Sequence, residues 1–201
     1  MNKTEDMTTF QKLALNGLMF ILAAVVFTVT FGDKVLSESN KSFAGEAVSA
    51  EGHIRVPENF RTDYVLMGSW SVAGDADTGG EIGLHIVYAP KNAVTAYRET
   101  GAFPDETVIV KELFTGETEF LTTGEATRAK DLVGYFVMVK DDKNRFPDNP
   151  LWGEGWGWSF FEGKTPNKTI STDYKSDCLA CHEPARETDF IYTNAYPVLK
   201  K

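Results

Sequence analysis

The sequence has few cysteines and methionines, and its basic residues are outnumbered by its acidic ones. These shortages exclude several common kinds of functional site. The 201 residues contain only two cysteines, and no methionine follows Met138. Two cysteines leave no material for a Cys-rich metal site or a disulfide framework. The sequence also has no GxxxxGK(S/T) or GxGxxG run, and its net charge is -9. We therefore expect neither a nucleotide-binding loop nor a basic surface for nucleic acid.

Both cysteines stand in one short motif, Cys178-Leu179-Ala180-Cys181-His182. A C-x-x-C-H run is the attachment site of a c-type haem, in which two thiols add to the vinyl groups and the adjacent imidazole reaches the iron. A dithiol redox pair or half of a zinc site fits less well, because the sequence has no second cysteine pair and the histidine directly follows the second cysteine. We predict a covalently attached haem c, with Cys178 and Cys181 as anchors and His182 as the proximal metal ligand.

The sequence offers no obvious protein ligand for the second axial position of the iron. A small electron-transfer cytochrome usually supplies a methionine far downstream of the motif, and this chain has none there. His53 and His85 are the other candidates, and either would make the protein an electron carrier. We favour an iron with one protein ligand and an open distal side, because that arrangement suits the binding of a small molecule.

The N-terminal part contains an apolar run at residues 13–32, which is 20 residues long and has no charge. A membrane-spanning helix needs ~20 apolar residues, whereas the apolar core of a signal peptide usually has ~7–15. Residues 1–32 are therefore predicted to be a membrane anchor, with a cleaved signal peptide as the alternative. Residues 33–50 are small and polar and are predicted to be a linker, which leaves residues 51–201 for the haem domain. Because c-type haem is attached outside the cytoplasm, we expect this domain on the periplasmic side of the membrane.

The hydrophobic pattern of residues 51–201 predicts an α+β domain, built mainly on an antiparallel β-sheet with a few short helices. Alternating or continuous apolar residues indicate strands, which we expect at residues 62–72, 82–89, 107–114, 132–140 and 155–163. A helix is expected at residues 91–101. Trp156, Trp158 and Phe160 recur at period two, which predicts an aromatic stripe on one face of the last strand. The haem motif is expected on a short helix.

Two segments carry a resemblance to a known family. FPDETVIVKELF (residues 103–114) and CLACHEPARETDFIYTNAYPVLK (residues 178–200) resemble the cytochrome P-460 family, and the similarity extends over about 51–201. The resemblance implies a mainly β, extracytoplasmic mono-haem protein, commonly a homodimer, that oxidises hydroxylamine to nitric oxide or nitrous oxide. The electrons would pass to an acceptor cytochrome. A related branch, the β-sheet cytochromes c′, binds nitric oxide or carbon monoxide instead.

The resemblance also implies roles for two residues on the expected strands. Family members carry a lysine whose side-chain nitrogen is bonded to a meso carbon of the porphyrin, and the matching residue is Lys111. Periodicity alone does not say which face of its strand points inward. Hydroxylamine-oxidising members carry a distal carboxylate where this chain has Phe136, and a phenyl ring cannot accept protons. We expect a hydroxylamine-oxidising haem enzyme, with a nitric oxide-binding protein that lacks turnover as the alternative, because a dry distal side favours a small apolar gas.

Overall fold

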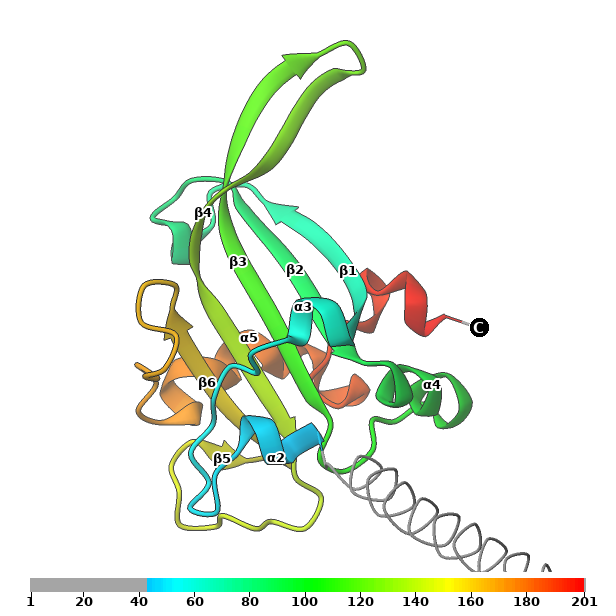
Figure 1. The fold of residues 1–201 in the computed structure, drawn as a ribbon, viewed down its shortest axis with the longest axis vertical. Helices are drawn as coiled ribbons and strands as arrows, with labels where there is room; N and C mark the ends of the chain where they lie inside the picture. The colour runs from blue at the N-terminus through cyan, green and yellow to red at the C-terminus, as the bar shows by residue number, and fades with distance from the viewer. Residues whose placement is uncertain (1–42, 201) are drawn as a thin grey trace, which may run out of the picture. The chain divides into compact units, whose positions relative to one another are not determined.

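The computed structural model describes residues 43–200, and their framework is one antiparallel sheet (Figure 1). Its six strands lie in the order β1-β2-β3-β4-β6-β5, and every neighbouring pair is antiparallel. The strands are β1 (Tyr64–Val72), β2 (Gly83–Pro90), β3 (Val108–Leu121), β4 (Gly124–Lys140), β5 (Trp152–Gly153) and β6 (Trp156–Glu162). Strands β1 to β4 are neighbours both in sequence and in space, as antiparallel strands with direct connections usually are.

Short helices account for most of the remaining regular structure in this part of the chain. They are α2 (Phe43–Ala47), α3 (Phe60–Asp63), η1 (Ala76–Thr78), α4 (Lys91–Thr100), η2 (Lys175–Leu179), α5 (Ala180–His182), η3 (Glu183–Thr188), η4 (Thr193–Ala195) and η5 (Pro197–Leu199). Helix α4 begins directly after Pro90 and is followed by Gly101. The φ angle of Gly101 is 83°, a left-handed conformation that glycine adopts without steric cost and that ends a helix.

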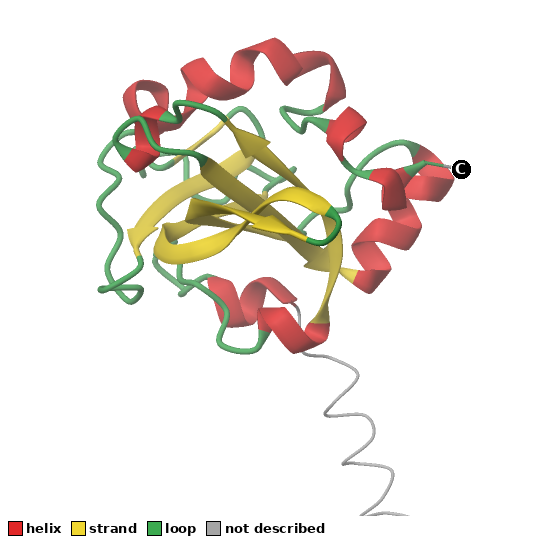
Figure 2. Cartoon of the chain, turned by 90° about the horizontal axis from the view of Figure 1, so that it is seen from above, coloured by secondary structure: helices red, strands yellow, loops and turns green. Residues whose placement is uncertain are grey.

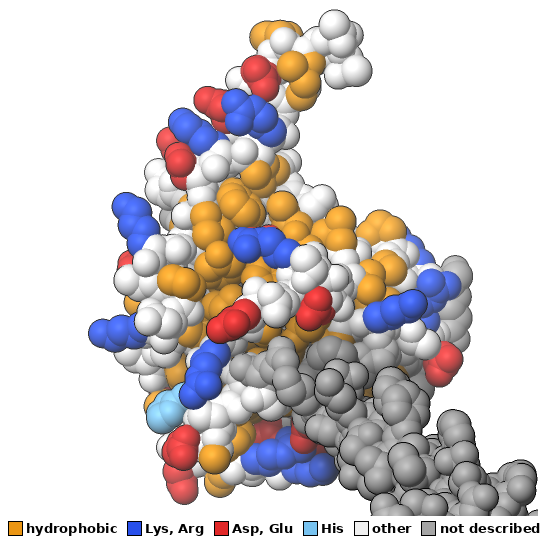
Figure 3. Space-filling view, viewed as in Figure 1, with side chains coloured by type: hydrophobic (Ala, Val, Ile, Leu, Met, Phe, Trp, Pro, Cys, Tyr) orange, Lys and Arg blue, Asp and Glu red, His pale blue; other side chains and the backbone are white. Residues whose placement is uncertain are grey.

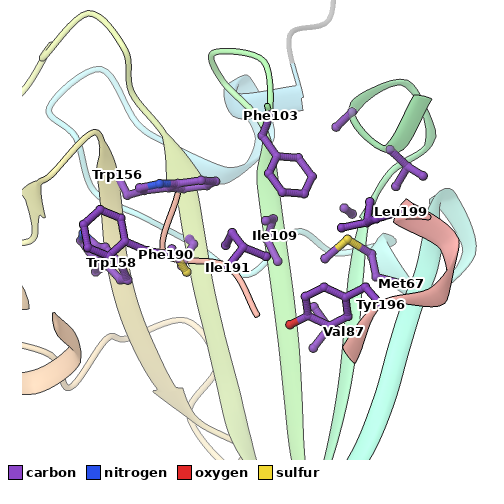
Figure 4. Packing of buried hydrophobic residues seen from close by; sticks show 14 of the residues in the cluster. Met67, Val87, Phe103, Ile109, Trp156, Trp158, Phe190, Ile191, Tyr196 and Leu199 are labelled. Atoms are coloured by element: carbon purple, nitrogen blue, oxygen red, sulfur yellow. The ribbon is translucent and has the colours of Figure 1, made fainter. Parts of the chain in front are cut away.

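The sheet buries side chains on both faces, and helical segments lie on both sides of it (Figure 2). Ile109 of β3 and Met138 of β4 belong to one hydrophobic cluster, together with residues of α4 and of the C-terminal segment 173–199 (Figure 4). Val110 and Val137 belong to a second cluster, which also contains residues of α2 and α3. Because successive residues of a strand point to opposite faces, these two central strands are apolar on both faces.

Strands β3 and β4 continue beyond the rest of the sheet as a two-stranded hairpin that turns between Leu121 and Gly124 (Figure 1). Its side chains pair across the strands, and Nε of Arg128 lies 2.9 Å from a carboxylate oxygen of Glu119. Charges of both signs lie side by side along the hairpin (Figure 3). Phe120 near the tip is 83% exposed. None of residues 116–129 belongs to either hydrophobic cluster, so cross-strand pairing alone supports the hairpin.

The predicted fold class is confirmed in outline, because the described residues form a mainly antiparallel sheet with a few short helices. Strands β1, β2 and β6 lie close to their predicted ranges. Strands β3 and β4 are much longer than the predicted 107–114 and 132–140. The difference is the hairpin, whose residues are polar and therefore lack the apolar alternation from which a strand is predicted.

The N-terminal predictions concern a different part of the chain. The predicted anchor at residues 1–32 lies outside the described residues. The described end of the predicted linker, 33–50, contains α2, whose Ala47 is fully buried. Within residues 43–200, no helix is long and apolar enough to cross a membrane.

Candidate functional site

A cavity of about 430 Å³ lies between one face of the sheet and the C-terminal segment 173–199. Side chains of β2, β3, β4 and β6 form its floor, and the C-terminal segment forms the opposite wall. All the site residues predicted from the sequence line this cavity, namely Lys111, Phe136, Cys178, Cys181 and His182. Most of the lining is apolar or aromatic, and the volume is typical of pockets that hold a small molecule or a cofactor.

The C-x-x-C-H motif begins on a π-helical turn, η2, and ends in α5. Asp177 holds the start of this segment, because its carboxylate accepts the backbone N–H groups of Thr172 at 2.7 Å and Asp173 at 3.1 Å. Cys181 is exposed and Cys178 is partly buried. Burial raises the pKa of the Cys178 thiol to about 11, so this thiol is protonated at neutral pH. The turn thus presents both sulfur atoms to the same cavity.

The imidazole of His182 is fixed by a hydrogen bond at Nδ1. This nitrogen lies 2.7 Å from the carbonyl oxygen of Phe190, and because a carbonyl oxygen only accepts, Nδ1 carries the proton. Trp158 packs against the imidazole in an edge-to-face geometry, with ring centroids 5.0 Å apart. Burial lowers the pKa of His182, which favours the neutral ring. A neutral ring with Nδ1 engaged leaves the Nε2 lone pair available as a metal ligand.

Lys111 and Phe136 face each other on the floor of the cavity. They are paired residues of β3 and β4, and Nζ of Lys111 lies 3.8 Å from the centroid of the Phe136 ring. Phe136 also stacks on Phe160, with centroids 4.3 Å apart. Lys111 has no ion-pair partner among residues 43–200, and burial lowers its pKa. Lys111 lines the cavity, and a lysine with a lowered pKa is a better nucleophile than an exposed one.

A family model now connects this geometry with known proteins. The model for Cytochrome P460 matches residues 57–193, a range that contains all five of these residues. The chain belongs to the cytochrome P460 family. A comparison with curated proteins gave no match. Membership confirms the resemblance found in the sequence and implies a c-type haem, and some members of the cytochrome P460 family are hydroxylamine-oxidising enzymes.

The residues of the cavity fit a haem of this type. One wall presents two thiols and an imidazole whose Nε2 is unengaged. The floor is mostly apolar and aromatic, its polar residues are His85, Lys111 and Ser159, and the Lys111 nitrogen lies over the Phe136 ring. A macrocycle with an apolar surface, held by Cys178 and Cys181 and ligated by His182, matches this set of groups. Lys111 would then lie beside the porphyrin on the side of the sheet.

His85 lines the cavity at its far end and forms a buried pair with Asp75. Only the histidine of this pair was expected from the sequence. Nε2 of His85 lies 2.6 Å from Oδ2 of Asp75, and the ring stacks on Trp70 with centroids 5.2 Å apart. Burial lowers the pKa of His85. His85 was a candidate ligand in the sequence, whereas Asp75 lies in a turn and had no signal. His53, the other candidate ligand, is exposed and does not line the cavity.

The register of the sheet places His85 away from His182. His85 pairs with Leu113, which follows Lys111 by two residues on β3. Trp158 pairs with Met138 of β4, and Met138 pairs with Ile109 of β3. Ile109 lies two residues before Lys111, so the row of paired residues that contains Trp158 meets β3 there. At about 3.3 Å per residue, these two rows are separated by about 13 Å. Because Trp158 contacts His182, His85 lies on the opposite side of the Lys111 row from His182.

Proposed function

We propose that this cytochrome P460 family member is a mono-haem c-type protein that binds hydroxylamine at an open distal iron site and oxidises it to nitric oxide or nitrous oxide. The observation that carries the proposal is the convergence of the two thiols, the His182 imidazole and the Lys111 amine on one cavity. The first three groups come from five consecutive residues of the C-terminal segment, but Lys111 comes from a strand in the middle of the sheet. The lysine is the group that a simple electron-transfer cytochrome does not need.

Each residue has a defined task in this proposal. Cys178 and Cys181 would hold the haem through thioether bonds, and His182 would offer Nε2 to the iron while its Nδ1–H donates to the Phe190 carbonyl. When bound, the haem supplies a redox-active metal that takes a small nitrogen ligand and passes its electrons to an acceptor. Lys111 is the residue for the porphyrin cross-link, which would alter the electronic properties of the macrocycle. Phe136 and its stacking partner Phe160 give this part of the floor an apolar surface.

Steady-state kinetics on the haem-loaded full chain test this proposal. Hydroxylamine and an artificial one-electron acceptor should give turnover that saturates with substrate, and the spectrum of the reduced protein should show a strongly red-shifted Soret band if Lys111 is bonded to the porphyrin. Mass analysis of the tryptic haem peptide should find the Lys111 peptide joined to it. A colourless product whose two cysteines are still open to alkylation would refute the haem assignment and the function with it.

Phe136 favours a second candidate, a protein that binds nitric oxide without turnover, as the β-sheet cytochromes c′ do. Its ring lies over the Lys111 nitrogen and stacks on Phe160, so the group at this position of the floor is apolar and cannot accept a proton from a substrate. Tight nitric oxide binding by the ferrous protein, together with absent hydroxylamine turnover, would favour this candidate. A six-coordinate low-spin iron in the resting protein would instead indicate an electron carrier.

The proposal extends to the location of the protein and to its partners. We propose a haem domain on the periplasmic side of the membrane, tethered by the apolar run at residues 13–32, with a cytochrome as the electron acceptor and a second copy of the chain as the oligomeric partner. Membrane fractionation of a tagged full chain tests the tether, because a cleaved signal would leave the protein in the periplasmic extract.

A further inference from the structure

Two consecutive residues just after the haem motif adopt a left-handed backbone conformation although neither is glycine. The φ angle of Asp189 is 59° and that of Phe190 is 64°. Non-glycine residues rarely adopt this conformation, and pairs of them persist only where the surrounding structure holds them. The carbonyl group that fixes His182 belongs to the second of these residues, so whatever holds this backbone also holds the hydrogen bond at Nδ1.

The side chain of Asp189 ties this backbone to the sheet. Its carboxylate accepts a hydrogen bond from Nζ of Lys140 at 3.1 Å and another from Nε1 of Trp156 at 3.2 Å. Lys140 is the last residue of β4 and Trp156 is the first residue of β6, and both are buried. They pair with each other in the sheet. The two donors therefore form a rigid platform beneath the carboxylate.

Two further contacts hold Phe190 in place, one through its backbone and one through its ring. The backbone N–H of Phe190 donates to the carbonyl of Ala185 at 2.8 Å. The Phe190 ring packs edge-on against Trp158 with centroids 5.8 Å apart, and Trp158 in turn packs against His182. The Phe190 carbonyl is thus held from three directions. Within residues 43–200, the side-chain hydrogen bonds of Asp189 connect this backbone to the ends of β4 and β6.

We propose that Asp189 is a positioning residue for the proximal imidazole, because it holds the Phe190 carbonyl on Nδ1 of His182 and thereby sets the strength of the His182–iron bond and the reduction potential of the haem. A ligating histidine that donates its second ring proton is a more basic ligand, and second-shell hydrogen bonding is one of the ways in which a protein adjusts haem. The inference rests on the haem assignment of the proposed function, and it does not depend on which substrate is oxidised.

Three variants separate the contribution of the carboxylate from that of the backbone. Asp189→Gly keeps a residue that tolerates the left-handed conformation but removes the acceptor. Asp189→Asn keeps both the left-handed backbone and a hydrogen-bond acceptor, because asparagine tolerates this conformation and its amide oxygen still accepts a hydrogen bond. Trp156→Phe removes one donor and leaves the backbone unchanged. Asp142→Asn is the matched control, because Asp142 binds the same Lys140 nitrogen at 3.0 Å but lies outside the haem-binding segment.

The readouts are the iron–histidine stretching band of the ferrous protein in resonance Raman spectra and the reduction potential, both measured on the haem-loaded full chain. In Asp189→Gly the band should move to lower frequency and the potential should rise, because the ligand becomes less basic. Trp156→Phe should give a smaller change of the same sign. Asp189→Asn and Asp142→Asn should stay close to wild type. Thermal unfolding of each variant shows that the fold is intact.

Two outcomes would overturn the assignment of Asp189. The first is a wild-type band and potential in Asp189→Gly. The second is an equal shift in Asp189→Asn and Asp189→Gly, which would show that the charge and not the held carbonyl is responsible. A holoprotein that shows the expected shifts but does not turn over hydroxylamine would refute the proposed function and support the role of Asp189.

Discussion

Replacement of Phe136 by glutamate places a carboxylate at the position where the resemblance to the cytochrome P-460 family implies one in the hydroxylamine-oxidising members. Phe136 lies on the floor of the cavity, directly opposite Lys111 on the neighbouring strand. A positioned general base contributes ~10²–10⁴ to the rate of a step that releases protons. Because nothing in the native cavity is arranged to hold the new side chain, we expect the lower end of that range, a rise of about 10²-fold in kcat/KM for hydroxylamine.

The state of Lys111 decides whether this gain can appear. The nitrogen lies 3.8 Å from the centre of the ring that is replaced. If it were a free ammonium, its attraction for a carboxylate at ~4 Å would be about 4 kcal/mol at an effective dielectric constant of ~20. That energy corresponds to about three pKa units, enough to hold the new carboxylate ionised and make it a poor base. A nitrogen bonded to the porphyrin carries no full positive charge, so the gain requires the cross-link.

The assay is steady-state oxidation of hydroxylamine by the haem-loaded full chain with an artificial acceptor, with mass analysis of the haem peptide on the same preparation. Phe136→Gln is the matched control, because glutamine has the shape of glutamate but no basic oxygen. An equal gain in both variants would show that the effect is steric. Brisk wild-type turnover that Phe136→Glu leaves unchanged, in a cross-linked preparation, would refute the distal role of this position.

Three further predictions concern stability and assembly. Trp158 is 1% exposed and packs on His182, so Trp158→Ala should lower the free energy of unfolding in urea by about 3–5 kcal/mol. Arg145 lowers the pKa of Asp105 to about 2, so the stabilisation from this carboxylate is present above about pH 4 and is lost as the pH falls toward 2. Asp105→Asn should remove roughly 2 kcal/mol of that pH dependence from acid unfolding curves. Phe120→Ser should leave the unfolding midpoint unchanged, and a lower sedimentation coefficient would place the proposed dimer contact at the hairpin.

The sequence marks the Cys178-Leu179-Ala180-Cys181-His182 motif more clearly than the rest of the cavity, for physical reasons. Cys178, Cys181 and His182 lie within five consecutive residues, so their spacing alone predicts haem attachment. Lys111 needed the resemblance, because its strand is apolar on both faces and alternation carries no information there. The structure resolves this ambiguity, since Lys111 shares the cavity with the haem motif.

The contacts that the sequence could not predict are those made by backbone groups and turns. The partner of His182 is a main-chain carbonyl, and a carbonyl has no residue-type signal. Asp75 reaches His85 from a turn ten residues earlier in the chain, and nothing in the turn sequence marks that aspartate for this contact. The hairpin was missed for a related reason, because its strands are supported by cross-strand pairs such as Arg128 with Glu119 and bury no apolar face.

The C-terminal segment 173–199 contributes no strand to the sheet, so its release would break none of the hydrogen bonds between the strands. It does supply apolar side chains such as Ile191 and Leu199 to the hydrophobic cluster that contains Ile109 of β3. One layer of the core is therefore carried by the same segment as the C-x-x-C-H motif. Any change that loosens this segment should expose the face of the sheet that lines the cavity.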